Sequence, residues 1–161
     1  MKQLLIIFSN IVTFILMNFL ASGQTSKFVN PTGLYKYSGK SYKKDGEIYG
    51  YFGNVKVDLV DSNSIHLNFY ICKGAPSYNS GSFIETLNYK NNKAVYFGDT
   101  TMPELTCKLT FDFTKTGINV ELYSVNPNWA CGFGHSVDTQ GFYRKIKRKV
   151  PTKEEILNYE E

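Results

Sequence analysis

The chain of 161 residues has few of the residues that build metal and redox sites. It contains two histidines and three cysteines, and it lacks the Cys-x-x-Cys spacing that is typical of structural zinc sites. It also lacks a glycine-rich phosphate loop before a helix and a Gly-x-Ser-x-Gly segment, the patterns of nucleotide binding and of many serine hydrolases. We therefore expect no metal, no cofactor and no catalytic activity.

Other absences bound the organisation of the chain. There is no internal repeat of fixed period and no low-complexity tract, so we expect a single domain. No Asn-x-Ser/Thr sequon occurs, and nothing indicates N-glycosylation in a eukaryotic secretory pathway. Alanine is scarce while Asn, Lys and Tyr are abundant, a bias that suggests an AT-rich genome.

The one long hydrophobic run lies at the N-terminus. Lys2 provides a positive start, residues 4–20 are almost wholly apolar, and small residues follow at 21–23, as signal peptidase requires. The alternative is a membrane anchor, but at about 1.5 Å per residue this run spans only about 26 Å, less than the roughly 30 Å of a hydrocarbon core. We predict a signal peptide over residues 1–23 and a secreted protein, periplasmic or extracellular, with no stable membrane anchor.

From residue 33 onward, apolar residues alternate with polar ones. In one segment Ile65, Leu67 and Phe69 alternate with His66 and Asn68. A period of two is typical of antiparallel strands that bury one face. We predict an all-β domain over residues 24–161 with eight strands, at residues 33–38, 49–60, 64–72, 81–89, 93–98, 107–113, 117–125 and 140–147.

The connections between these strands differ in length in a regular way. Three are tight polar turns and the others are longer loops, at residues 39–48, 73–80, 99–106 and 126–139. In an up-and-down arrangement successive connections alternate between the two ends of the molecule, so the short turns share one end and the long loops share the other. Binding residues tend to lie on loops held by a rigid scaffold, and the long-loop end is therefore the predicted functional face.

Three cysteines in an oxidising compartment favour one disulfide and one free thiol. Pairing Phe113 with Ile118 across their turn places Cys107 near the long-loop end, close to where Cys131 is expected. We therefore favour a Cys107–Cys131 disulfide, which would tie down the longest loop, and place Cys72–Cys131 second.

The first and last strands open in a similar way, with Gly33-Leu-Tyr-Lys and Gly141-Phe-Tyr-Arg. At these residues the chain resembles the calycins, the lipocalin- and avidin-like barrels, in which a basic residue of the last strand covers a Gly-x-Trp of the first. The resemblance implies an eight-stranded antiparallel up-and-down barrel in which Tyr35 replaces the Trp and Arg144 covers its ring by a cation–π contact. A capping-box pattern at residues 152–155 predicts a short C-terminal helix on the barrel wall.

The most distinctive segment is Cys131-Gly-Phe-Gly-His. It resembles a segment of small secreted bacterial domains, Bacteroidetes-like, and this resemblance implies no particular activity. Glycines on both sides of Phe133 permit a tight bend that could present His135 to a ligand. The alternative is a glycine-rich turn in which the imidazole hydrogen-bonds to the backbone.

Aromatic residues concentrate on the predicted long loops. Exposed aromatic side chains with small polar neighbours suit the recognition of a protein or glycan surface. We expect Trp129 to be the most buried of these aromatic residues and Tyr78 to be exposed. The predicted contact residues are Tyr42, Tyr78, Asn79, Trp129, Phe133 and His135.

Basic residues cluster at positions 144–149, within a chain of net charge +4. They could touch an acidic partner or lipid headgroups, but we interpret them as a solubilising end to the last strand. Because nucleic-acid-binding proteins usually carry a broader basic face, we expect no nucleic acid partner.

The leading hypothesis is a non-catalytic barrel that binds an envelope or extracellular protein through its long-loop end. A concrete version is an inhibitor or immunity protein acting on a cell-wall hydrolase, by analogy of size, compartment and fold with bacterial lysozyme inhibitors. An alternative is a carrier of a small hydrophobic ligand in the barrel mouth, although eight strands enclose space for little more than their own side chains. A second alternative is a hydrolase that uses His135 as a general base, with Ser77 or Cys131 among its candidate partners.

Overall fold

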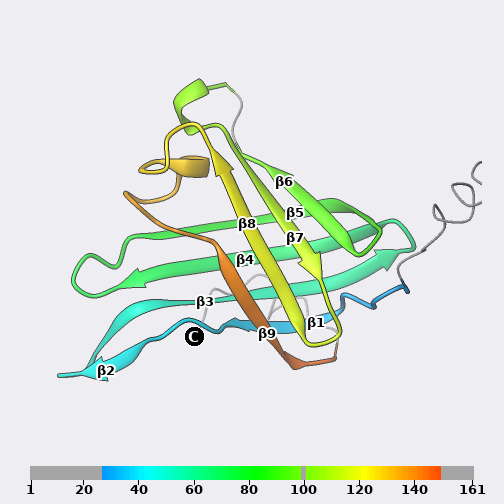
Figure 1. Cartoon of the computed structure of the whole chain (residues 1–161), viewed down its shortest axis with the longest axis horizontal. Coiled ribbons are helices and arrows are strands. Elements are labelled where there is room, and N and C mark those ends of the chain that lie inside the picture. Colours follow the sequence, from blue (N-terminus) through cyan, green and yellow to red (C-terminus); the bar gives the residue numbers. More distant parts are fainter. Residues whose placement is uncertain (1–26, 99–100, 150–161) are drawn as a thin grey trace, which may run out of the picture.

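The computed structural model describes residues 27–98 and 101–149, which form an all-β fold (Figure 1). Strands account for most of this part of the chain, and it contains no α-helix. The strands are β1 (Gly33–Tyr37), β2 (Tyr42–Lys44), β3 (Glu47–Asp61), β4 (Ser64–Gly74), β5 (Ser80–Lys90), β6 (Lys93–Phe97), β7 (Cys107–Phe113), β8 (Gly117–Ser124) and β9 (Gly141–Lys147). Two short 3₁₀ helices, η1 (Pro103–Leu105) and η2 (Ala130–Gly132), lie in the long loops.

Eight of these strands close into an antiparallel barrel. The sheet order is β1-β9-β8-β7-β6-β5-β4-β3-β2, and β1 pairs with β3 as well as with β9. This second pairing closes the ring and leaves β2 outside it, as a hairpin arm against the start of β3. Closure removes the exposed edges that invite aggregation.

The predicted strands are confirmed, and the added strand has a local cause. β2 and β3 are joined at Asp45 and Gly46, and both residues have positive φ, 53° and 83°. An Asp-Gly pair in this conformation is the preferred two-residue hairpin turn. The turn extends β3 toward its N-terminus, to Glu47, beyond the predicted start at residue 49.

The alternation of side chains fills the interior of the barrel. Along β4, Ile65, Leu67, Phe69 and Ile71 are fully buried. They meet inward-facing residues of every other barrel strand, and aromatic rings occupy much of the space. Phe69 alone lies within ring contact of Phe83, Phe111, Phe133 and Tyr143, with ring centroids 5.5–6.3 Å apart.

The first and last strands repeat the same tyrosine arrangement. The Tyr35 hydroxyl donates a hydrogen bond to the Pro31 carbonyl, and the Tyr143 hydroxyl donates one of 3.1 Å to the Thr139 carbonyl. In both cases the carbonyl lies four residues earlier, on the other side of a glycine with positive φ. The hydrogen bonds satisfy two buried phenols and pin the chain where it enters β1 and β9.

The predicted cation over Tyr35 is wrong by one residue. The ammonium of Lys145, not the guanidinium of Arg144, lies 5.2 Å from the centre of the Tyr35 ring. Tyr35 pairs with Lys145 across β1 and β9, and Lys145 has the same parity as inward-facing Tyr143. Arg144 has the opposite parity and is exposed on the outer face.

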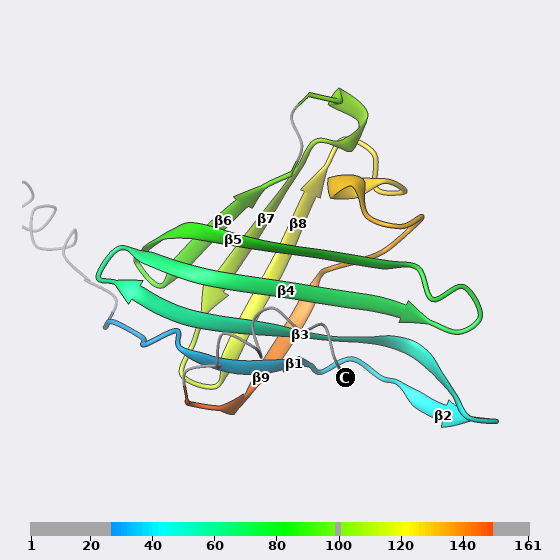
Figure 2. The same ribbon diagram turned by 180° about the vertical axis from the view of Figure 1, so that it is seen from behind.

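Short turns and long loops lie at opposite ends of the barrel, as predicted. The β3–β4, β5–β6 and β7–β8 turns are tight. Of the other four connections, three carry β2, η1 or η2, and the fourth is the β4–β5 loop. Figure 2 shows β2 and the β4–β5 loop projecting together at one side of the long-loop end. The predicted C-terminal helix and signal peptide lie outside the described residues.

Candidate functional site

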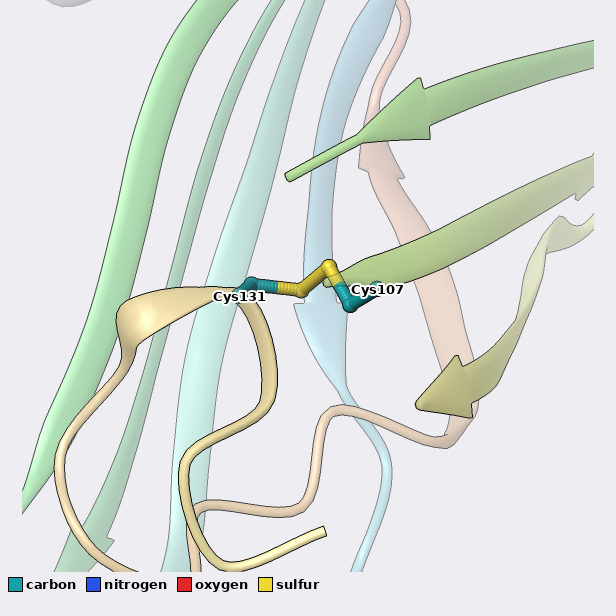
Figure 3. Close-up of a disulfide and its surroundings, with 2 residues drawn as sticks. All are labelled: Cys107 and Cys131. Carbon is teal, nitrogen blue, oxygen red and sulfur yellow. A yellow bond between two sulfur atoms is a disulfide. The ribbon is translucent and has the colours of Figure 1, made fainter. Parts of the chain in front are cut away.

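The disulfide anchors the longest loop to the barrel. Cys107, the first residue of β7, is bonded to Cys131 in η2, with their Cα atoms 5.1 Å apart. Figure 3 shows this bond joining the β8–β9 loop to the start of β7. The predicted pairing is confirmed, and Cys72 is a buried free thiol. A disulfide at Cys131 leaves no thiolate there for catalysis.

Phe133 closes the mouth of the barrel instead of facing a partner. Its ring is only 6% exposed and stacks on Phe69 with a centroid distance of 6.3 Å. A Cβ atom at Gly81 would lie 2.3 Å from the ring, so glycine at that position on β5 makes room for the plug. The prediction of Phe133 as a contact residue is therefore wrong, because the bend that would present His135 turns Phe133 into the core.

Hydrogen bonds hold the β8–β9 loop over this plug. The Asn79 side-chain amide donates to the His135 carbonyl at 2.9 Å. The Tyr51 hydroxyl donates to the Ser136 carbonyl at 2.9 Å and accepts a hydrogen bond from the Asp138 amide at 3.1 Å. Asn79 thus joins two long loops, and Tyr51, which the sequence analysis did not single out, performs the same task from β3.

Trp129 and His135 form an exposed pair on the outside of this loop. Their rings meet edge to face at 5.2 Å, and 46% of Trp129 is exposed. Trp129 was expected to be the most buried loop aromatic, but the plug position is occupied by Phe133. The Ser136 hydroxyl lies 3.1 Å from His135 Nδ1 and 2.9 Å from Asn128 Oδ1, which fixes the imidazole at the surface.

A second aromatic group lies on the projecting arm. Tyr42 on β2 and Tyr49 on β3 stack face to face, with centroids 5.2 Å apart and planes 9° apart. Partial burial raises the pKa of Tyr49, and the neighbouring Glu47 carboxylate raises it further. Tyr78 in the β4–β5 loop is 41% exposed, and its hydroxyl accepts a hydrogen bond from the Ile48 amide at 3.3 Å.

Hydrogen bonds link the three segments that carry these groups. The arm joins the β4–β5 loop through the Ile48–Tyr78 hydrogen bond, and that loop joins the β8–β9 loop through Asn79. We call these five residues, Tyr42, Tyr49, Tyr78, Trp129 and His135, the aromatic rim. They offer flat rings, hydroxyls and an imidazole, and exposed charged residues such as Lys43, Lys44 and Glu47 lie beside them on the arm.

Among the described residues, His135 hydrogen-bonds to neither Ser77 nor Cys131, which were among its predicted catalytic partners. The hydroxyl that contacts His135 belongs to Ser136, its neighbour in sequence, and not to Ser77. Within residues 27–98 and 101–149, no group of three or more His, Cys, Asp or Glu side chains is placed to hold a metal ion. In the same residues, no helix is long and apolar enough to cross a membrane.

Comparison with known proteins gives no match: no family model, no curated protein and no solved structure is similar to this chain. The function must therefore be argued from the site itself.

Proposed function

We propose that this protein binds another protein through the aromatic rim and has no catalytic role. The observation that carries the proposal is the exposure of Tyr42 on the β2 arm, Tyr78 in the β4–β5 loop and Trp129 in the β8–β9 loop. Hydrogen bonds and the disulfide tie these segments to one another and to a closed barrel. Aromatic side chains held rigidly at the surface supply large contact area with little loss of conformational entropy on binding. A rim already ordered by hydrogen bonds also reduces the cost of association.

The filled interior favours a protein partner over a small hydrophobic ligand. Phe133 covers the mouth, and below it Phe69, Phe83 and Phe111 are in mutual ring contact. A ligand in the barrel would have to displace Phe133 and break these contacts. The rim, in contrast, is accessible without rearrangement.

The compartment we propose is outside the cytoplasm, periplasmic or extracellular. The Cys107–Cys131 disulfide supports it, because such bonds persist in oxidising compartments. In that compartment a rigid barrel with a loop-end recognition surface suits an inhibitor or immunity protein that covers a cell-wall hydrolase. We also propose that the barrel is a calycin-like up-and-down barrel. The contact of the Lys145 ammonium, from the last strand, with the Tyr35 ring of the first strand supports this.

Affinity capture with matched variants tests the proposal. The secreted protein, immobilised, is exposed to envelope extract, and bound proteins are compared for the parent, Tyr78→Ala, Trp129→Ala and the control Tyr123→Ala. Tyr123 is 70% exposed on the outer face of β8 and is not one of the rim residues, so its substitution removes an aromatic side chain of the same kind from the barrel wall. We expect the two rim variants each to weaken capture by roughly tenfold or more, as expected for aromatic hot spots.

The control decides how the result is interpreted. Tyr123→Ala should capture the same proteins as the parent, and all variants should melt within a few degrees of it. If the rim variants retain full capture, or if Tyr123→Ala loses as much, the rim is not the binding surface. Native mass spectrometry of the same samples tests the carrier alternative, which requires a bound small molecule that is lost on denaturation.

A further inference from the structure

Cationic side chains converge at the short-turn end, opposite the aromatic rim. Two adjoining hollows, of about 310 and 490 Å³, open there. Both are lined by Lys115 of the β7–β8 turn, Lys145 of β9 and Arg148, which follows β9. Figures 1 and 2 both show the β7–β8 turn beside the end of β9. The basic residues at 144–149 were predicted to be a solubilising end of the last strand, and nothing in the sequence indicates that Lys115 lies beside them.

The barrel fixes this arrangement. The Lys145 amide donates a hydrogen bond to the Thr116 carbonyl at 2.8 Å, and Gly117 pairs with Arg144, so turn and strand are held side by side. The Lys145 ammonium is itself positioned, because it donates to the Asn30 carbonyl at 2.9 Å and lies over the Tyr35 ring. One cation of the cluster therefore has a fixed place before any ligand binds.

No carboxylate neutralises the cluster within residues 27–98 and 101–149. Lys93 forms an ion pair with Asp112, and none of the three cations is in an ion pair with a described residue. Burial lowers the pKa of Lys145, and repulsion from Arg148 lowers it further. The fold thus places positive charges close enough to repel one another. An anion bound between them would offset this repulsion.

We propose that these hollows bind a phosphate group between Lys115, Lys145 and Arg148. Arginine and lysine are the usual partners of phosphate oxygens, and charge-assisted hydrogen bonds are the strongest available to them. Thr116, in the wall of the larger hollow, offers a hydroxyl donor. Phe28 lines the smaller hollow and is exposed, so it can contact an apolar part of the molecule that carries the phosphate. The phosphate group belongs either to a lipid headgroup or to a soluble phosphate.

Two probes distinguish these sources. The first is a titration of the ¹⁵N-labelled secreted protein with inorganic phosphate at constant ionic strength, with chloride as the reference anion. The second is flotation with vesicles of equal parts phosphatidylglycerol and phosphatidylcholine, compared with vesicles of phosphatidylcholine alone. Amide shifts centred on Lys115, Thr116 and Lys145, or flotation with the anionic vesicles only, are the expected results. The first assigns a soluble phosphate, and the second assigns a headgroup.

A matched pair of variants locates the site. Lys115→Gln/Arg148→Gln removes two exposed cations from the hollows and leaves Lys145 in place. Lys90→Gln/Lys108→Gln lowers the net charge equally, at exposed positions outside the hollows. The first variant should bind the responding probe roughly tenfold more weakly, as expected for lost charge-assisted hydrogen bonds, and the second should bind like the parent.

Equal losses in both variants would mean that binding follows net charge alone, and the site would be refuted. Absence of phosphate shifts together with equal flotation on both vesicle types would refute it as well. Neither double variant alters the aromatic rim. A negative result for phosphate binding therefore says nothing about partner capture by the rim, and a negative capture result says nothing about phosphate binding.

Discussion

At the scale of single residues, side chains close in sequence have opposite tasks. Phe133 fills the barrel mouth, whereas Trp129 and His135, in the same loop, face outward. The glycines on both sides of Phe133 permit the bend that turns its ring inward. Gly81, across the barrel mouth, leaves the space that the ring occupies. One short loop can therefore seal the core and carry a recognition surface at the same time.

This division of tasks predicts opposite results for two alanine substitutions. Phe133→Ala should lower the free energy of unfolding by about 3 kcal/mol, because it removes a buried ring and leaves a cavity. Trp129→Ala should change it by less than about 1 kcal/mol, because nearly half of the indole is already in water. Urea unfolding followed by tyrosine fluorescence measures both, and equal losses would show that Phe133 is not the plug.

Residue parity along the strands decides which of these features follow from the sequence. The disulfide was predictable because the register of one tight turn places Cys107 near the long-loop end, close to Cys131. The cation over Tyr35 was misassigned, although Lys145 shares the parity of Tyr143, because the resemblance pointed to the basic residue directly after that tyrosine. No such period exists in the β8–β9 loop, so nothing in the sequence distinguishes the buried Phe133 from the exposed Trp129.

At the scale of elements, tyrosine hydroxyls fasten the chain that leads into the barrel. The Tyr89 hydroxyl on β5 donates to the Val29 carbonyl at 2.6 Å, and Asn92 accepts a hydrogen bond from the Val29 amide at 2.8 Å. Residues 27–32 are thereby held against the short-turn end, where they form one wall of the smaller hollow. The missed strand β2 belongs to this scale too, since its Asp-Gly turn was the available signal for it.

The fastening by Tyr89 predicts a loss of stability at alkaline pH. Burial raises the pKa of Tyr89 from its ordinary value of 10.0 to about 12, and the Asp112 carboxylate contributes to the same shift. Since the unfolded chain ionises first, the contribution of the neutral phenol is complete below about pH 10 and is lost as pH rises toward 12.

Urea unfolding at neutral and alkaline pH tests this for the parent and Tyr89→Phe. The variant should be less stable at neutral pH, because it lacks the hydrogen bond to Val29. It should also lose less stability between pH 10 and 12 than the parent does. If both proteins lose the same amount over this interval, the alkaline sensitivity arises from other tyrosines.

At the scale of the whole molecule, the closed barrel separates two surfaces of different chemistry. The long-loop end carries neutral aromatic rings, and the short-turn end carries unpaired cations among the described residues. The alternation of residues predicted the barrel and its two ends, because strand periodicity and turn length are local properties. The cationic site could not be predicted in the same way, since Lys115 lies far in sequence from Lys145 and Arg148.

Site-specific photo-crosslinking tests the central claim, recognition of a protein by the aromatic rim, most directly. A photoreactive phenylalanine analogue replaces Tyr42 in one preparation of the secreted protein and Tyr123 in another, and each is irradiated in envelope extract. Our account predicts a discrete crosslinked protein from position 42 that is absent from position 123, and the same protein in the capture experiment. Crosslinks from position 123 but not from position 42 would contradict the account and move the binding surface to the barrel wall.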